Sequence, residues 1–338
     1  MEREERSSSK RLDWADAVKV VATLAVIALH SQRGVEPTDP PACFFLYYAA
    51  RCAMPLFFMV NGAMILAKED YSFEYCARKI LNMAKILVAW GLITGIYFLA
   101  FRGATPIEAL KAVVLGALGK TDVLNVWFLY SFAVIYLVLA VPGVHGFVRK
   151  HAGVIAPSLA CVCAVVAIAS RLSIADGGFF VQAAVTQRFR LWTWFAYFVA
   201  GRALADSETT KSLPGFPVGL AAILATFAVV AMQYDGCWLA TGTANSEYMY
   251  DEPLLFAWCV LIFATFMTNP RLSKAFAPFA SISFGAFLLQ SYLIDAFEIR
   301  GMATSPLMGV ALWLAVAATC LSASRVLSRT PVRKIMTY

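Results

Sequence analysis

Charged side chains are scarce in this chain. Asp, Glu, Lys and Arg make up 14% of its 338 residues and hydrophobic residues make up 60%, whereas charged residues reach roughly 25% in soluble domains. Long polar stretches are missing as well, because no segment between the apolar runs exceeds about 25 residues. This leaves no room for a separate soluble catalytic domain, so any activity belongs to the apolar part of the chain or to its two surfaces.

The motifs of common soluble enzymes are also missing. The eight cysteines form no pair of CxxC motifs, and the sequence has no Gly-rich phosphate loop, no zinc-ligand spacing and no Gly-x-Ser-x-Gly elbow. We therefore expect no metal site and no permanently bound cofactor.

What the sequence has instead is a series of apolar windows of about 18–20 residues, a length that crosses the roughly 30 Å hydrocarbon core of a bilayer. We predict an all-α, polytopic integral membrane protein with about ten transmembrane helices. The segment 104–119 is shorter and contains Glu108 and Lys111, so we expect it to lie at the membrane surface. The expected spans are approximately residues 14–31, 42–67, 76–101, 124–142, 153–170, 190–205, 215–233, 251–268, 278–297 and 304–325.

The positive charge is distributed as in a membrane protein. If the N-terminus is cytoplasmic, 17 of the 28 Lys and Arg residues lie on the cytoplasmic side, 8 lie outside and three lie within spans. This bias predicts cytoplasmic N- and C-termini and accounts for the net charge of +7 without a nucleic-acid partner. The expected divisions are a basic N-terminal segment 1–13, a membrane-embedded domain 14–325 and a basic tail 326–338.

The first span carries a stripe of polar residues. Asp16, Lys19, Thr23 and His30 fall within about 60° of one another at 100° per residue, and the stripe is about 21 Å long. Ionisable residues inside a span usually face a cavity that serves a function. In the alternative interpretation, Asp16 and Lys19 are interfacial and His30 ends the helix among the outer headgroups.

Arg51 lies in the second span, about nine residues from its outer end and at a depth similar to that of His30. A cation beside a histidine favours the neutral imidazole, which accepts a proton. This predicts a catalytic pair of His30 and Arg51. Pairing of Arg51 with an acidic side chain for structural reasons alone is the alternative.

The third span begins with a basic face. Arg78, Asn82 and Lys85 are spaced by four and three residues, so they share one side of a helix. Together with Lys19 they predict a cation cluster at the inner side, suited to a phosphate-bearing cytoplasmic ligand. Anionic lipid headgroups are the alternative partner.

The outer side differs in composition. The segment 234–252 has no Lys or Arg, but it contains Glu252 and three other carboxylates together with Trp and Tyr residues. Such a surface suits sugar hydroxyls, although Trp and Tyr also form ordinary interfacial belts.

Several segments, in order along the chain, resemble the acyltransferase-3 family of multi-pass membrane acyltransferases. They match its opening Arg…Asp-x-x-(Arg/Lys)…His helix, its Phe-Phe-x-x-Ser-Gly segment, its basic third helix, its Trp-Phe-Leu span and its late Ser-(x)-Gly-x-Tyr-Leu-x-His segment. The matching stretches are RLDWADAVKVVATLAVIALH (11–30), MPLFFMVNG (54–62), ARKILNMAKILVAW (77–90), VWFLYSFAVIYLVLAVP (126–142) and ISFGAFLLQSYLID (282–295).

This resemblance implies transfer of an acyl group, usually acetyl, from cytoplasmic acyl-CoA to a hydroxyl of a cell-envelope carbohydrate or similar acceptor, in a bacterial-type cytoplasmic membrane. His30 matches the family's catalytic histidine, and Lys19 and Arg78 or Lys85 match its basic positions. The chain departs from the pattern twice, with Asn61 in place of Ser and Gln290 in place of the late His.

Residues and resemblance together predict three groups of site residues. His30 and Arg51 are the expected catalytic pair, His30 acting as base or as acyl carrier. The expected donor-binding residues are Asp16, Lys19, Arg78 and Lys85. The expected acceptor or cavity residues are Asn61, Trp127, Tyr130, Gln290 and Glu252.

Two other functions stay open at this point. The buried ionisable residues also suit a proton or substrate relay in a transporter, although no symmetrical pair of broken segments indicates inverted repeats. The loss of the late His also suits a membrane module that binds acyl-CoA without turning it over. The expected partners are membrane lipid, acyl-CoA and a carbohydrate or glycolipid acceptor.

Overall fold

The computed structural model describes residues 12–32, 41–118, 121, 123–299 and 306–336. It is 84% helical, and the described residues contain no strand, which confirms the predicted all-α fold. Most of the predicted segment 1–13 and the last two residues of the predicted tail lie outside the described residues.

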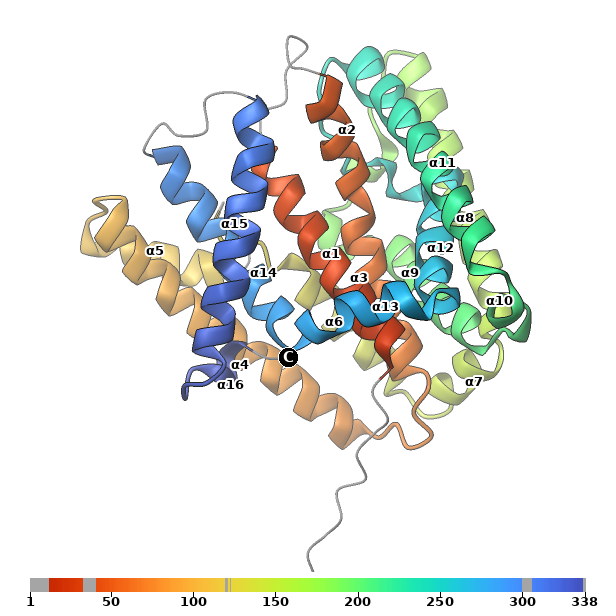
Figure 1. Ribbon diagram of the computed structural model, residues 1–338, viewed down its shortest axis with the longest axis horizontal. Helices are drawn as coiled ribbons and strands as arrows, with labels where there is room; N and C mark the ends of the chain where they lie inside the picture. Colours follow the sequence, from red (N-terminus) through yellow and green to blue (C-terminus); the bar gives the residue numbers. More distant parts are fainter. Residues whose placement is uncertain (1–11, 33–40, 119–120, 122, 300–305, 337–338) are drawn as a thin grey trace, which may run out of the picture.

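Sixteen α-helices occur among the described residues (Figure 1): α1 (Asp13–Ser31), α2 (Pro41–Ala49), α3 (Ala53–Ile65), α4 (Phe73–Phe101), α5 (Pro106–Ala117), α6 (Trp127–Leu139), α7 (Val144–Lys150), α8 (Ala152–Ala175), α9 (Leu191–Asp206), α10 (Glu208–Ser212), α11 (Gly215–Gln233), α12 (Pro253–Thr268), α13 (Pro270–Phe276), α14 (Ala280–Ile299), α15 (Pro306–Leu327) and α16 (Arg333–Met336). Short 3₁₀ turns are η1 (Ala50–Cys52), η2 (Val181–Ala184), η3 (Gln187–Phe189), η5 (Met249–Asp251) and η6 (Ala277–Phe279), and η4 (Tyr234–Leu239) is π-helical.

Seven of the helical segments in the described part are long and apolar enough to cross a membrane, or eight if the bent pair α6–α7 counts as one span. This is fewer than the ten predicted. Within the expected span 124–142 the helix is only α6, of 13 residues. The chain then bends by 99° before α7, passing through Pro142 and Gly143, whose φ is +82°. The expected spans 190–205 and 251–268 correspond to α9 and α12, each of 16 residues. At 1.5 Å per residue each helix is about 24 Å long.

Helix α1 lies near the centre of the bundle. It packs against α3, α12, α13, α14 and α15, which come from both halves of the sequence (Figure 1). In α1, 61% of the membrane-length window is buried inside the protein, against 17% for α11. The polar stripe of the first span is therefore enclosed by other helices.

Two glycines allow α3 and α9 to touch. A Cβ on Gly62 would lie 1.7 Å from the Phe198 carbonyl oxygen, and a Cβ on Gly201 would lie 1.9 Å from the Met59 carbonyl oxygen. No side chain fits at these distances, so the backbones approach as closely as small residues permit. This contact fixes α3, which carries Asn61, against the core.

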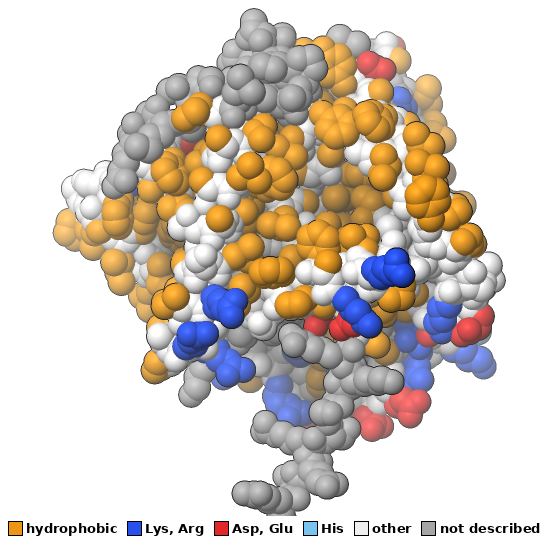
Figure 2. All heavy atoms as spheres, viewed as in Figure 1, with side chains coloured by type: hydrophobic (Ala, Val, Ile, Leu, Met, Phe, Trp, Pro, Cys, Tyr) orange, Lys and Arg blue, Asp and Glu red, His pale blue; other side chains and the backbone are white. Residues whose placement is uncertain are grey.

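Helix α5 lies within the expected segment 104–119 and packs lengthwise against α4. It begins with a capping box, in which Glu108 and Thr105 satisfy each other's backbone N–H groups. Ile107 and Leu110 are exposed on its outer side. Figure 2 shows hydrophobic side chains over the middle of one face of the molecule and Lys and Arg side chains in its lower part, from the level of α13 down to that of α16 in Figure 1.

Candidate active site

A cavity of about 610 Å³ lies among α1, α3, α4, α6 and α14, at the end of the bundle where α1 begins. Its lining changes character from a cationic part to an aromatic part. The polar lining residues are Lys19, Lys68, Lys79, Tyr75, Asn61, Ser281 and Ser283. The aromatic lining residues are Phe57, Phe128, Phe132, Phe284 and Phe287. We call this cavity the central pocket.

Three lysines from different elements reach the central pocket. Lys19 is half-buried on α1, and its Nζ lies 3.1 Å from Asp16 Oδ1. Lys68 follows α3, and its Nζ lies 4.8 Å from the centre of the Tyr75 ring. Lys79 is half-buried on α4. Three ammonium groups at one mouth attract an anionic ligand such as a phosphate.

The structure does not bring Arg78 and Lys85 to this pocket. Both are exposed on α4, outside the pocket lining, on the shared face that their spacing predicts. Lys79 instead continues the buried stripe of Met83, Ile86 and Trp90 at spacings of four, three and four. The apolar stripe marks the inner face of a helix, so a lysine in line with it was the sequence signal for this position.

Asn61 lies in the pocket lining and joins two of its walls. Its Nδ2 donates to the Phe57 carbonyl oxygen at 3.1 Å, and its Oδ1 accepts from the Tyr136 hydroxyl at 3.1 Å. The amide therefore links α3 to α6, a role that an isolated hydroxyl at this position fills less completely because it has fewer hydrogen-bonding groups.

The aromatic part of the pocket leads toward His30. The lining follows α14 from Ala280 to Phe287, and Gln290 lies three residues farther along the same helix. Gln290 Nε2 lies 2.7 Å from His30 Nδ1 and donates to Ser291 Oγ at 2.7 Å. His30 is eleven residues beyond Lys19 on α1, which is about 16 Å. The two helices thus connect a cationic mouth to a histidine deeper in the bundle.

The residues of the polar stripe of α1 make different contacts along the helix. Lys19 lines the pocket and His30 meets α14. Between them, Thr23 is buried and donates to the Lys19 carbonyl oxygen at 3.0 Å. Thr23 therefore satisfies its hydroxyl within its own helix.

Arg51 is buried, at 6% exposure, but its hydrogen-bonding partners are tyrosines. Its Nη2 donates to the Tyr47 hydroxyl, its guanidinium lies 4.7 Å from the centre of that ring, and it also hydrogen-bonds with Tyr250. Among the described residues it pairs neither with a carboxylate nor with His30, and its Nε has no partner. A catalytic role for Arg51 stays a prediction.

The remaining predicted residues do not line the central pocket. Trp127 packs against Trp194, with ring centres 5.0 Å apart. Tyr130 donates to the Ala117 carbonyl oxygen. Glu252 accepts from Arg171 Nε at 2.8 Å.

The neighbouring carboxylate, that of Asp251, lies inside the protein. Asp251 is buried and accepts from Thr193 and from Gln182. Burial raises the pKa of the Asp251 carboxyl, although these hydrogen bonds oppose the shift. Asp251 and Glu252 therefore hold the segment 234–252 in place, with both side chains largely buried.

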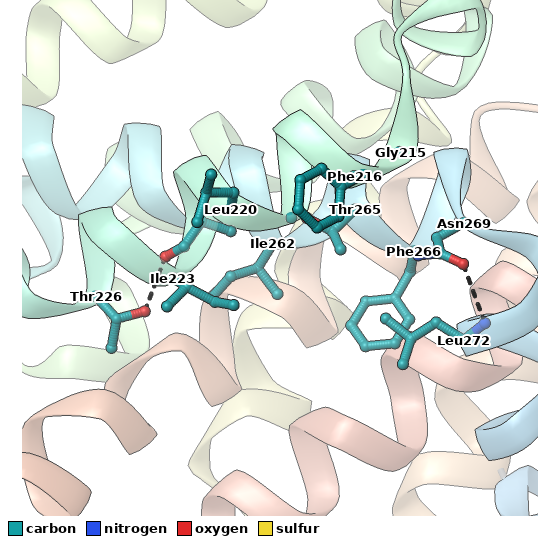
Figure 3. Close-up of a pocket in the computed structure, with 12 residues that line it drawn as sticks. Gly215, Phe216, Leu220, Ile223, Thr226, Ile262, Thr265, Phe266, Asn269 and Leu272 are labelled. Atoms are coloured by element: carbon teal, nitrogen blue, oxygen red, sulfur yellow. Dashed lines mark hydrogen bonds between the residues drawn. The ribbon is translucent and has the colours of Figure 1, made fainter.

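A second cavity, of about 400 Å³, lies between α11 and α12 (Figure 3). Its hydroxyl groups are satisfied by protein groups: Thr226 donates to the Ala222 carbonyl and accepts from Trp258 Nε1 on α12, and Thr265 donates to the Leu261 carbonyl. Asn269 Oδ1 accepts from the Leu272 N–H. The rest of the lining is apolar, so this lateral cavity offers a surface for hydrocarbon and no reactive group.

Comparison with known proteins identifies a family. A family model described as an acyltransferase domain, that of the acyltransferase-3 family, matches residues 12–328, nearly the whole chain. No curated protein and no solved structure matches. The matched range includes His30, Gln290 and the three lysines of the central pocket.

Proposed function

This chain belongs to the acyltransferase-3 family, and we propose that it transfers an acyl group, by default acetyl, from cytoplasmic acyl-CoA to a hydroxyl of a cell-envelope carbohydrate or glycolipid. The membrane in question is a cytoplasmic membrane of bacterial type. The observation that carries the proposal is the arrangement of the central pocket, with lysines at its mouth and His30 beyond its aromatic end.

The pocket suits the two chemical parts of an acyl-CoA. The phosphates of coenzyme A are anionic and match the ammonium groups of Lys19, Lys68 and Lys79. The pantetheine arm and the acyl group are less polar and match the walls formed by Phe57 and Phe287. In this arrangement the thioester enters along α1 and α14 in the direction of His30.

His30 supplies the chemistry at the inner end. In direct transfer, the acceptor hydroxyl attacks the thioester carbonyl carbon while the imidazole takes the hydroxyl proton. The new carbon–oxygen bond forms, the carbon–sulfur bond breaks, and the leaving thiolate takes the proton back. In the alternative route, an imidazole nitrogen attacks the carbonyl first and the acyl group passes to the acceptor in a second step.

The test is thioester loss from acetyl-CoA added to the cytoplasmic face of the reconstituted protein, with an envelope extract as a mixture of acceptors. Wild type is expected to consume acetyl-CoA, and His30→Ala is expected to lose about 10²–10⁴-fold in turnover, the usual contribution of a general base. His151→Ala is the matched control, because this half-exposed histidine lies at the start of α8, away from the pocket.

Two results would contradict the proposal in different ways. Binding of acetyl-CoA without consumption identifies a binding module in which the chemistry has been lost. No binding at all favours the transporter interpretation.

A further inference from the structure

The strongest unexplained feature near the site is the side chain of Gln290. It is fully buried, at 0% exposure, and it meets a histidine that lies 260 residues away in sequence. Its Nε2 contacts both His30 Nδ1 and Ser291 Oγ at 2.7 Å. Its Oε1 has no partner among the residues that the structure describes.

In this orientation of the amide, the contact fits only an imidazole whose Nδ1 carries no proton. An amide NH₂ group only donates hydrogen bonds, so the contact requires an unprotonated Nδ1 that accepts. A neutral imidazole of this kind carries its proton on Nε2. In that form, Nε2 is a donor and does not accept a proton from an acceptor hydroxyl.

Rotation of the Gln290 side-chain amide by half a turn exchanges Nε2 and Oε1 and so reverses the hydrogen-bonding requirement at His30 Nδ1. With Oε1 toward the ring, the amide accepts from an Nδ1–H and leaves the lone pair on Nε2. Ser291 fits both orientations, because a hydroxyl accepts from Nε2 of the amide in one and donates to Oε1 in the other. In each orientation the amide atom that points away from His30 lacks a partner, so the two orientations differ mainly in the imidazole tautomer that they match.

We propose that Gln290 is a positioning residue that determines which ring nitrogen of His30 carries the proton. With the amide nitrogen toward Nδ1, His30 rests in the Nε2–H form. With the amide oxygen toward Nδ1, His30 is a base at Nε2. This inference rests on the proposed function for its catalytic meaning, but the tautomer itself is a property of the resting protein.

The turned orientation is also the one that the reaction needs. When Nε2 takes the proton of the acceptor hydroxyl, the ring becomes an imidazolium with an N–H on both nitrogens. An N–H at Nδ1 repels the amide NH₂ and is stabilised by the amide oxygen. The same Nε2 proton then passes to the leaving thiolate of coenzyme A, and the ring returns to the neutral form.

The first test is nitrogen-15 NMR of the purified protein labelled at histidine. The sequence has only three histidines, and the His30 signals are assigned by their loss in His30→Gln. Wild type is expected to show an unprotonated Nδ1 and a protonated Nε2 at His30. In Gln290→Glu, whose carboxylate only accepts, Nδ1 is expected to be protonated. An Nδ1 that is protonated in wild type, or a tautomer that is the same in both proteins, would overturn the proposal.

The second test separates positioning from structural support. Gln290→Leu is expected to lower kcat for acetyl-CoA consumption by about tenfold to a hundredfold, as loss of a partner that orients a catalytic group does, with the donor KM within about twofold of wild type. Gln290→Glu is expected to retain more activity than Gln290→Leu. Equal losses in both variants, or a loss confined to KM, would contradict a positioning role.

The two tests also distinguish this inference from the proposed function. If wild type consumes no acetyl-CoA but the His30 tautomer changes in Gln290→Glu as expected, the proposed function fails and the role of Gln290 in setting the tautomer is retained. If wild type consumes acetyl-CoA and the His30 tautomer is the same in wild type and in Gln290→Glu, only the inference fails.

Discussion

The central pocket and the lateral cavity both lie between helices, yet their polar side chains differ in kind: the central pocket gathers three lysines, whereas the lateral cavity has only hydroxyl and amide groups in its described lining. In the lateral cavity, Thr226 and Thr265 donate to carbonyls of their own helices. In the central pocket, Lys19, Lys68 and Lys79 come from different elements and converge. A hydroxyl that bonds within its own helix leaves an apolar surface, whereas side chains that converge from several elements create a polar environment.

The comparison shows why polarity within a span is an incomplete sign of a site. Thr23 lies on the same stripe of α1 as Lys19 and His30, but its hydroxyl is satisfied by the Lys19 carbonyl. His30 reaches across to α14. Polarity within a span therefore marks a candidate residue, and the packing of the helices decides whether its side chain reaches a cavity or a reactive partner.

The largest effect is expected at Gly62, which follows the pocket residue Asn61 on α3 and faces α9. Gly62→Ala places a methyl group 1.7 Å from the Phe198 carbonyl oxygen, and overpacking of this kind costs typically about 1–3 kcal/mol. We expect a lower yield of folded protein and a lower Tm in detergent.

The matched control is Gly219→Ala in the lateral cavity, where the added Cβ would lie 3.5 Å from Thr265 Cγ2, an ordinary contact. Alanine also favours the helix, so the Tm of this variant is expected to stay the same or rise. A similar fall in Tm for both variants would show that the tight α3–α9 contact is not what distinguishes the two positions.

The next effect is expected at the mouth of the central pocket. Lys79→Ala and Lys68→Ala each remove one charge from the pocket lining. A charge-assisted hydrogen bond contributes about 1.5–3 kcal/mol, so each variant is expected to raise the donor KM roughly tenfold or more, with kcat little changed.

Arg78→Ala and Lys85→Ala are the controls for these variants, because both residues are exposed on α4 outside the pocket. Their donor KM is expected to stay within about twofold of wild type, since an exposed charge is screened by salt. A larger rise in the donor KM for Lys85→Ala than for Lys79→Ala would place the donor on the exposed face of α4.

The smallest effect is expected in the lateral cavity. Thr265→Val replaces a hydroxyl that donates to the Leu261 carbonyl of its own helix with a methyl group of similar size. We expect turnover of acetyl-CoA to be unchanged and the free energy of unfolding to change by about 0.5 kcal/mol or less. A loss of turnover in this variant would mean that the lateral cavity takes part in the reaction.

The number of spans shows how much of the fold the hydropathy of the sequence can predict. Seven of the ten expected spans correspond to helices long enough to cross a membrane, because hydropathy is a property of a continuous window. The expected spans 190–205 and 251–268 are also apolar, but their helices are 16 residues long. The ends of these helices depend on the helices and turns packed around them, which hydropathy does not describe.

The sequence by itself determined that this chain is helical and apolar enough for a membrane, that it carries the motifs of one family, and that His30 shares a face of α1 with Lys19. Each of these properties is encoded in residue types and spacing along one segment. Lys79 stands in line with the apolar stripe of its helix, but the tertiary structure alone decided that this face lines a pocket, that Arg51 bonds with tyrosines, and that Gln290 meets His30. The physical reason is that the rotation of a helix about its axis, and its partner across the bundle, follow from the packing of many helices at once.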